Sequence, residues 1–254
     1  MEILIESDYD AVCERAAAVV RDAVKRKPSL VLGLATGKTP VGLYARLRTS
    51  KVSFKGVRFF NLDELYGVGP EHEESFNHFL RVNLLDHLRV PEKNVKLLNG
   101  DVKDLEKAAD DYEKAIRKAG GIDLQLLGVG NNGHIAFNEP GSSLGSRTRP
   151  KTLTDETLAQ YRKPGKEPVS NFAITMGVGT IMDARRLLML VSGEGKAAVV
   201  REFIEGPVTA EIPASVLQFH PQALVILDEA AASKLKRRDY YKWVASNKWR
   251  VGQK

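Results

Sequence analysis

Long apolar runs are scarce in this chain, and their scarcity argues against one large class of proteins. The longest, at 187–191 and 224–227, are far shorter than the roughly 20 residues that cross a bilayer. The first ten residues, MEILIESDYD, lack the basic start and the long apolar segment of a signal peptide. We therefore expect neither a membrane protein nor a secretory leader.

Cysteine is almost missing as well, since Cys13 is the only one. An intrachain disulfide is therefore excluded, which fits the reducing cytoplasm where we expect this protein. The histidines show no spacing typical of zinc ligands: His72, His78, His87, His134 and His220. We expect no metal and no cofactor.

The positive charge is confined to one end of the chain. The net charge is +6, but residues 234–254 hold eight Lys or Arg and one Asp, so this tail carries +7 and the rest about −1. Basic residues interleaved with aromatics can bind nucleic acid. We favour a solvated C-terminal helix that docks Tyr240, Tyr241, Trp243 and Trp249 on the body, and we expect no nucleic-acid partner.

Short apolar segments alternate with helical patterns along one domain, 1–254, that ends in this tail. Continuous apolar runs typical of buried parallel strands occupy 30–35, 57–61, 122–128, 172–177, 187–192 and 223–228. Helices are expected at 8–27, 40–48, 75–88, 104–118 and 194–205, and a loop at 160–170. The alternation predicts a doubly wound, mostly parallel, Rossmann-like α/β fold with helices on both faces and a first strand near Leu30.

The turn TGKTP follows the first of these predicted strands and opens a helix. Free N–H groups at a helix start form an anion site, to which Thr36, Gly37, Lys38 and Thr39 would contribute. The turn matches neither the Walker A loop nor the dinucleotide motif. Lys196, in the GEGKA turn after a later strand, would complete a phosphate site.

Two acidic residues, Asp63 and Glu64, follow the second predicted strand. A carboxylate held in a dry cleft can act as a base. Taken alone, the pair is more simply explained as a cap on the next element.

The stretch GVGNNGHIAFNEPG, 128–141, places His134 among glycines and asparagines. Histidine titrates near neutral pH and is the usual proton carrier of active sites. Asn132 and Glu139 are close enough in sequence to hold the imidazole ring and set its tautomer. We interpret this stretch as a reaction centre rather than a plain turn.

At these residues the chain resembles the glucosamine-6-phosphate deaminases, also called glucosamine-6-phosphate isomerases. The resemblance covers roughly residues 3–230 and rests on segments in the family's order and spacing: LGLATGKTP, FFNLDELYGV, GVGNNGHIAFNEPGSSLGSRTR, ITMGVGTIMDA, SGEGKA and PASVLQFHP. The segment GHIAFNEPGSS is the most specific of them.

The resemblance implies that glucosamine 6-phosphate and water give fructose 6-phosphate and ammonia, without metal or cofactor. It implies that His134 opens the sugar ring, that Glu139 orients the imidazole, and that Asp63 moves a proton from C2 to C1. The turn at 36–39, Lys196 and an arginine before the strand at 172 would hold the phosphate. Arg162 is our choice for that arginine, with Lys163 as the alternative.

Two features vary within this family. Many members have Asp where this chain has Asn132; an Asp would strengthen the imidazole as a base, but we expect activity to persist with Glu139 in place. Some members are hexamers that bind an N-acetylated sugar phosphate as an effector, and others are unregulated monomers. A match to the effector pattern is found at Ser143, Arg149, Lys151 and Thr152. The resemblance therefore leaves a homo-oligomer and its regulation open.

Three alternatives remain at this point. A 6-phosphogluconolactonase shares the fold, but lactone hydrolysis needs no base at C2, which argues against it. A sugar-phosphate-sensing domain of a transcription regulator would usually follow a helix-turn-helix, for which there is no room before a strand near Leu30. A preference for galactosamine 6-phosphate, the C4 epimer, is not excluded.

Overall fold

The computed structural model describes residues 1–161 and 169–247, and Arg162 and Lys163 lie outside the described residues. Its main feature is a seven-stranded sheet in which every neighbouring pair of strands is parallel. In spatial order the strands are β1 (Glu2–Glu6), β10 (Ala223–Asp228), β9 (Leu187–Val191), β6 (Leu124–Leu127), β2 (Val31–Leu34), β3 (Arg58–Asn61) and β5 (Val95–Lys96). This confirms the predicted doubly wound α/β fold.

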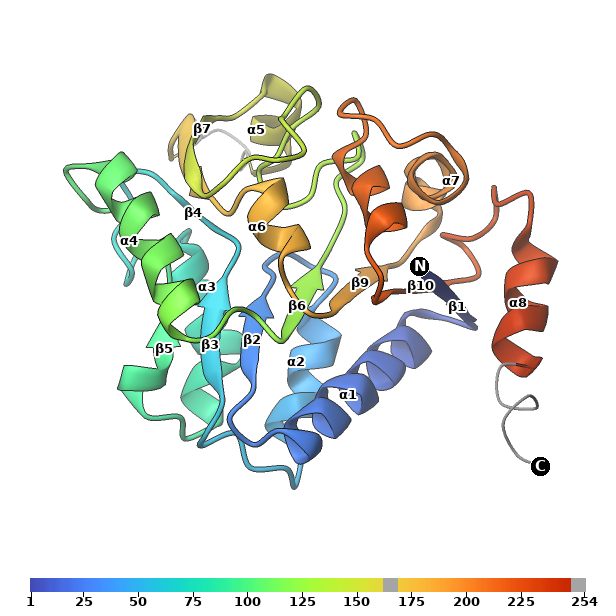
Figure 1. Cartoon of the computed structure of the whole chain (residues 1–254), viewed down its shortest axis with the longest axis horizontal. Helices are drawn as coiled ribbons and strands as arrows, with labels where there is room; N and C mark the ends of the chain where they lie inside the picture. The colour runs from blue at the N-terminus through green and yellow to red at the C-terminus, as the bar shows by residue number, and fades with distance from the viewer. Residues whose placement is uncertain (162–168, 248–254) are drawn as a thin grey trace.

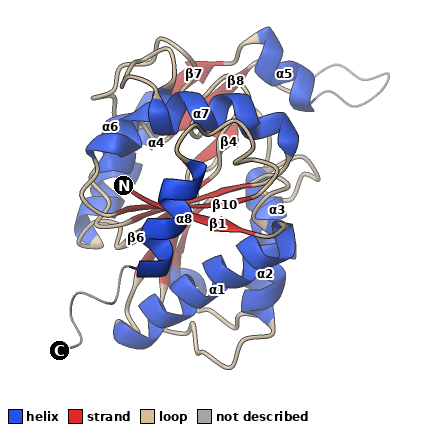
Figure 2. Cartoon of the chain, turned by 90° about the vertical axis from the view of Figure 1, so that its right-hand side faces the viewer, coloured by secondary structure: helices blue, strands red, loops and turns tan. Residues whose placement is uncertain are grey.

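Helices cover both faces of this sheet. Figure 2 shows α1 (Tyr9–Arg26) and α2 (Val41–Arg48) below the strands and α7 (Ala197–Glu205) above them. The remaining helices are α3 (Phe76–Asn83), α4 (Leu105–Lys118), α5 (Asp155–Tyr161), α6 (Val178–Met182) and α8 (Arg238–Asn247). Right-handed crossovers explain the two layers, because connections that run in opposite directions across a parallel sheet place their helices on opposite faces.

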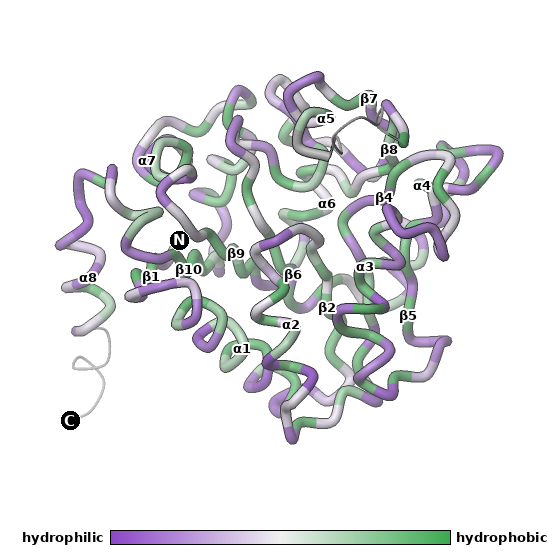
Figure 3. The backbone as a smooth tube through the Cα atoms, turned by 180° about the vertical axis from the view of Figure 1, so that it is seen from behind, coloured by the Kyte–Doolittle hydropathy of each residue, from purple (hydrophilic) through white to green (hydrophobic). Residues whose placement is uncertain are grey.

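The apolar core lies between the sheet and its helices. Strands β2, β6 and β9 are buried along their whole length, as expected of parallel strands covered on both sides. Figure 3 shows β2 and β9 mostly in the hydrophobic colours and many of the outer loops and helices in the hydrophilic ones. Helix α1 begins where the sequence predicts, because Asp8 accepts a hydrogen bond from the backbone N–H of Ala11 at 2.9 Å.

The order of the strands contains a switch point between β2 and β6. From β2 the chain builds outward through β3 to β5, then returns to the other side of β2 and builds through β6 and β9 to β10. Loops that leave the carboxyl ends of two such strands diverge and open a crevice, which is where open α/β sheets bind ligands.

A smaller antiparallel sheet corrects one prediction. The run at 172–177 is predicted for the main sheet, but β8 (Phe172–Thr175) lies between β4 (Asp63–Leu65) and β7 (Arg149–Thr152). An apolar run shows that a strand is buried but not which sheet it joins. In Figure 1 this small sheet stands above the carboxyl ends of β2, β3 and β6, packed around a second apolar cluster that includes Phe76 and Phe137.

Two further predictions were wrong at element boundaries. The first strand is β1 at Glu2–Glu6, not one near Leu30; its mostly half-buried side chains are typical of a sheet edge rather than of a central strand. The helix expected over 75–88 ends at Asn83, because Leu84 leaves the helical region (φ −144°, ψ −62°) before a short 3-10 turn.

The C-terminal helix α8 docks only part of its aromatic set. Tyr241 packs against the core, but Tyr240 is 58% exposed and Trp243 is 63% exposed. At about 100° per residue, Trp243 points roughly opposite to Tyr241, so both cannot face the body. The predicted docking is therefore wrong for Tyr240 and Trp243, and Trp249 lies outside the described residues.

Candidate active site

The predicted site residues follow neighbouring strands at one edge of the sheet. Strands β9, β6, β2 and β3 are consecutive in space, and their carboxyl ends lead to Lys196, the His134 loop, the TGKTP turn and Asp63 respectively. Segments that are far apart in sequence thus follow one edge of the sheet on both sides of the switch point, as the fold predicts.

Asp63 begins β4, two residues after the end of β3. Its backbone is fixed by Asn61, whose amide nitrogen donates to the Asp63 carbonyl at 2.8 Å. The Asp63 side chain is 5% exposed, and no hydrogen bond within the described residues reaches its carboxylate. Burial, together with the charge of Glu64, raises the pKa of Asp63 to about 8. A carboxyl group of this kind can exchange protons near neutral pH.

Glu64, by contrast, caps a helix. Its carboxylate accepts hydrogen bonds from the hydroxyl of Ser75 at 2.7 Å and from the backbone N–H groups of Phe76 and Asn77 at 2.9 and 2.8 Å. These groups form the N-terminus of α3, whose positive end favours a carboxylate. The capping interpretation of the acidic pair therefore holds for Glu64 and not for Asp63.

In the loop after β6, the His134 ring packs closely against the backbone of Gly130. A Cβ atom at Gly130 would lie 2.3–2.5 Å from three ring atoms of His134, so only glycine allows the ring to rest there. Gly133 has a φ of +87° and Ala136 a φ of +50°, which folds the loop tightly around the ring. Two glycines of the stretch therefore serve to seat the imidazole.

Glu139 is the acidic partner of His134. Its Oε2 lies 3.5 Å from Nδ1 of the ring and accepts a hydrogen bond of 2.9 Å from the amide of Asn132. Burial alone would raise the pKa of Glu139, but the polar contacts of His134, Thr157 and Asn132 outweigh it and lower that pKa to about 2. Glu139 thus stays ionised beside the ring at neutral pH.

Asn132 does not hold the imidazole directly. Its side chain donates to Glu139 and accepts a hydrogen bond of 3.2 Å from the backbone N–H of His134. Since the amide NH₂ group is a donor, Asn132 orients the carboxylate that in turn faces the ring. An ionised aspartate at this position could not donate that bond.

The His134 loop is tied to the small sheet that carries Asp63. The Thr175 hydroxyl of β8 accepts a hydrogen bond of 3.1 Å from the backbone N–H of Phe137, and Thr175 is the ladder partner of Asp63. Asn138 adds a second tie, because its amide donates to the Met176 carbonyl at 2.8 Å. Asn138 and Thr175 escaped the sequence analysis; the polar Asn138 within the FNEP segment was the one available signal.

The proposed anion loop lies at the other side of the switch point. Gly37 has a φ of +98°, and Pro40, the N-cap residue of α2, makes no side-chain capping hydrogen bond. Lys196 reaches toward the His134 loop, where its ammonium group donates to the Val129 carbonyl at 2.9 Å. Burial lowers the pKa of Lys196, which forms no ion pair with any described residue. A half-buried cation without an acidic partner is suited to bind an anion.

The residues that match the effector pattern lie mostly on β7. Arg149, Lys151 and Thr152 belong to this strand, and Ser143 lies exposed in the loop before it. The Arg149 guanidinium donates to the Asn138 side chain at 2.9 Å, and burial lowers its pKa. Within the described residues Arg149 has no acidic partner.

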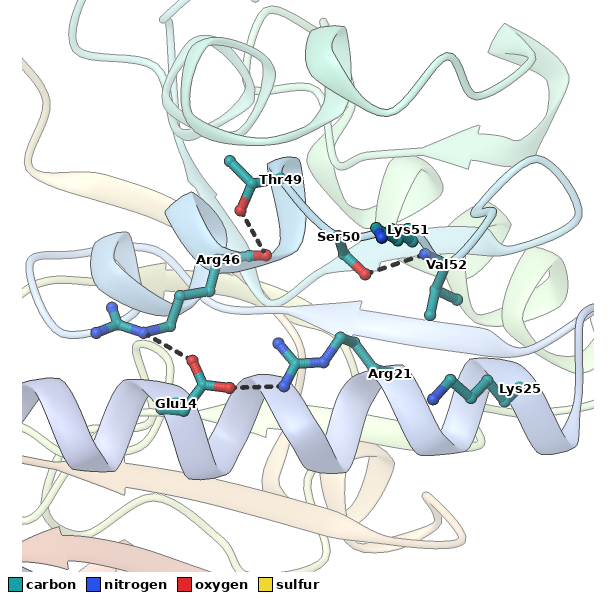
Figure 4. Close-up of a pocket in the computed structure, with 8 residues that line it drawn as sticks. All are labelled: Glu14, Arg21, Lys25, Arg46, Thr49, Ser50, Lys51 and Val52. Atoms are coloured by element: carbon teal, nitrogen blue, oxygen red, sulfur yellow. Dashed lines mark hydrogen bonds and ion pairs between the residues drawn. The ribbon is translucent and has the colours of Figure 1, made fainter.

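A pocket between α1 and the end of α2 contains none of the predicted site residues. Its charged side chains mostly pair with each other, since Glu14 lies 2.7 Å from Arg21 and 3.3 Å from Arg46 (Figure 4). Across residues 1–161 and 169–247, acidic, histidine and cysteine side chains form no cluster suited to a metal, and no helix is long and apolar enough to span a membrane.

Comparison with known proteins shows the family of this chain. The model of the family of glucosamine-6-phosphate isomerases and 6-phosphogluconolactonases matches residues 6–226. A glucosamine-6-phosphate deaminase of Hahella chejuensis is 48% identical, covering 99% of this chain and 98% of its own length. Glucosamine-6-phosphate deaminase 2 of Bacillus subtilis is 44% identical, covering 94% and 100%.

Solved structures give the same result. A monomeric glucosamine-6-phosphate deaminase has a TM-score of 0.89 and 37% identity, covering 92% of this chain and 100% of its own. A 6-phosphogluconolactonase from Trypanosoma cruzi has a TM-score of 0.75 at 24% identity, covering 92% and 97%, which shows a common fold. The chain is thus an α/β protein of the sugar-phosphate isomerase and lactonase type. It belongs to the family of glucosamine-6-phosphate isomerases and 6-phosphogluconolactonases.

Proposed function

We propose that this protein is a glucosamine-6-phosphate deaminase, which converts glucosamine 6-phosphate and water to fructose 6-phosphate and ammonia. The observation that carries the proposal is that Thr175 of β8 links the buried Asp63, its ladder partner, to the loop that holds the His134–Glu139 pair. The full-length relatives with this name support it. The reaction needs two proton carriers, one for the ring oxygen and one for the carbon chain.

The phosphate binds first in this scheme. Thr36, Gly37, Lys38 and Thr39 offer N–H groups and side chains at the start of α2, and Lys196 approaches from the end of β9. The phosphate is remote from C1 and C2, so its binding energy holds the sugar in register for proton transfer. Arg162 remains our proposal for an additional phosphate ligand.

His134 then opens the ring. The imidazole takes the proton of the C1 hydroxyl and returns one to the ring oxygen, which breaks the bond between C1 and that oxygen and leaves an open-chain aldehyde. Glu139, ionised and 3.5 Å from Nδ1, stabilises the imidazolium that forms in between. The other ring nitrogen is left for the substrate.

Asp63 completes the isomerisation. Its carboxylate removes the proton from C2, and a proton of the C2 ammonium group passes to O1, which gives a neutral enolamine. The same carboxyl group then delivers its proton to C1. The resulting C2 imine adds water and releases ammonia, which leaves the C2 ketone of fructose 6-phosphate. A pKa of about 8 suits this role, because the group both accepts and donates a proton near neutral pH.

The lactonase alternative explains less of the site. Hydrolysis of a lactone removes no proton from carbon, so a buried Asp63 held apart from its capping neighbour Glu64 would have no task. The similarity to lactonase structures, as with the Trypanosoma cruzi protein at 24% identity, supports the fold alone.

The deciding experiment measures ammonia and fructose 6-phosphate released from glucosamine 6-phosphate in the presence of a chelator. We expect turnover by the wild type and a loss of at least about 10²-fold for Asp63→Asn. Asp22→Asn, which changes an exposed carboxylate on α1, serves as the matched control and should keep full activity. A folded wild type that releases no ammonia, but hydrolyses 6-phosphogluconolactone, would favour the lactonase. Galactosamine 6-phosphate in parallel tests the choice of epimer.

We also propose an effector site for N-acetylglucosamine 6-phosphate at Ser143, Arg149, Lys151 and Thr152. Arg149 is half-buried and has no acidic partner among the described residues, which favours the binding of an anionic effector there. In the family such a site accompanies a homo-oligomer, so light scattering belongs with the kinetics. Hyperbolic saturation that does not shift when N-acetylglucosamine 6-phosphate is added would rule the site out.

A further inference from the structure

Tyr9, the first residue of α1, holds the anion loop from a different helix. Its hydroxyl accepts a hydrogen bond of 2.9 Å from the backbone N–H of Gly42 and lies 3.0 Å from the Thr39 carbonyl and 3.3 Å from the Lys38 carbonyl. One side chain thus contacts three backbone groups of the turn that opens α2.

The sequence leaves space for this hydroxyl. A Cβ atom at Gly42 would lie 2.8 Å from the Tyr9 hydroxyl oxygen and 2.7 Å from the sulfur of Cys13, so a larger residue would push both away. Pro40, the N-cap residue of α2, offers no side-chain hydrogen bond. The Tyr9 hydroxyl therefore takes the place of the missing cap on Gly42.

The contact also fixes the direction of the loop's peptide groups. In a trans peptide the C=O and the following N–H point to opposite sides. Because the Lys38 carbonyl faces Tyr9, the Thr39 N–H is turned away from α1. The carbonyl oxygens of Lys38 and Thr39, which would repel a phosphate, are drawn toward the tyrosine.

A second tyrosine fixes the other end of the same loop. The Tyr44 hydroxyl donates to the Ala35 carbonyl at 2.6 Å and accepts from the Ala35 N–H at 3.2 Å. Tyr44 is fully buried, so it belongs to the core as much as to the loop. Tyr9 is only partly buried, so its hydroxyl can be removed with less effect on packing.

We propose that Tyr9 is a positioning residue for substrate, which acts by holding the turn from Lys38 to Gly42 in the conformation that receives the phosphate. The proposal rests on the function proposed above for the loop. It assigns Tyr9 no contact with the sugar and no part in proton transfer. Its loss should therefore weaken phosphate binding and leave the chemical step nearly unchanged.

The test is Tyr9→Phe, which keeps the ring and removes only the hydroxyl. One or two lost hydrogen bonds correspond to a rise of about 5- to 20-fold in the KM for glucosamine 6-phosphate, with kcat within about twofold of the wild type. The dissociation constant for inorganic phosphate, measured by calorimetry, should rise by a similar factor. Tyr240→Phe, which removes an exposed hydroxyl on α8, is the matched control and should change neither quantity.

The phosphate titration separates the two proposals, because it needs no turnover. A wild type that binds phosphate without releasing ammonia contradicts the deaminase but leaves Tyr9 testable by calorimetry. A Tyr9→Phe variant with unchanged KM and phosphate affinity, or with a loss confined to kcat, overturns the positioning role. So does a wild type that binds no phosphate. If Tyr9→Phe folds poorly, Gly42→Ala disturbs the same contact from the other side and should also raise KM.

Discussion

Replacing Asp63 by asparagine removes a carboxyl group that binds its proton far more tightly in the folded chain than in the unfolded one. Burial and the neighbouring Glu64 charge raise the folded-state pKa of Asp63 to about 8, against an ordinary value near 3.8. Between these two values the folded state holds a proton that the unfolded state has lost. The free energy of unfolding therefore falls as pH rises through this window.

The size of the effect follows from linkage. One proton of difference changes the free energy of unfolding by about 1.4 kcal/mol per pH unit. From pH 5 to pH 8, Asp63 therefore lowers the stability of the wild type by about 4 kcal/mol. Below pH 3.8 both states are protonated and the penalty vanishes; above pH 8 both are charged and it stays constant. The side-chain amide of the Asp63→Asn variant does not titrate, so the variant escapes this loss.

Urea unfolding at pH 5, 6, 7 and 8 measures the difference between the Asp63→Asn variant and the wild type. We expect the variant to gain relative stability steadily across the series, while Asp22→Asn, at an exposed carboxylate, shows no such slope. A difference that stays flat with pH would show that Asp63 titrates at its ordinary value in the folded state. It would refute the assignment of Asp63 as a base tuned by burial.

Four further outcomes follow from the site. The kcat/KM of the wild type should rise with pH toward about 8 as Asp63 loses its proton, and a profile already flat at pH 5 would contradict this. Glu139→Gln should lower kcat by at least about 10²-fold, measured as ammonia release, because the imidazolium loses its ionised partner. Asn132→Asp replaces a donor 2.9 Å from Glu139 by a second carboxylate, so the pKa of Glu139 should rise above about 2 in an NMR titration of its carboxylate; an unmoved pKa would show that the two side chains are not coupled. Gly130→Ala should displace the His134 ring and abolish turnover in a protein that still folds, as judged by circular dichroism.

The arrangement of the site could be predicted from sequence where it depends on strand order. Apolar runs followed by polar turns place His134, Lys196 and the TGKTP turn at the carboxyl ends of strands, and the structure has them there. The resemblance singled out Asp63, but the residue pattern alone could not predict that Glu64 is the capping carboxylate, because this depends on which of the two meets the N-terminus of α3. That contact is made by residues that lie 12 and 13 positions further along the chain.

The small sheet escaped prediction for a related reason. The run at β8 is as apolar as a strand of the main sheet, and periodicity carries no information on its partners. The role of Tyr9 was hidden too, since its hydroxyl meets Gly42 across 33 residues and tyrosine at the start of a helix has no fixed meaning. Contacts of this range arise from packing, which local patterns do not encode.

The middle strand of the small sheet, β8, fixes the spacing between Asp63 on β4 and Arg149 on β7. On one side Thr175 is the ladder partner of Asp63, and on the other side it is the ladder partner of Arg149. The same threonine holds the Phe137 backbone of the His134 loop through its hydroxyl. A ligand that displaces β7 must therefore stretch this ladder or move Asp63 and the His134 loop with it, because Thr175 links all three segments.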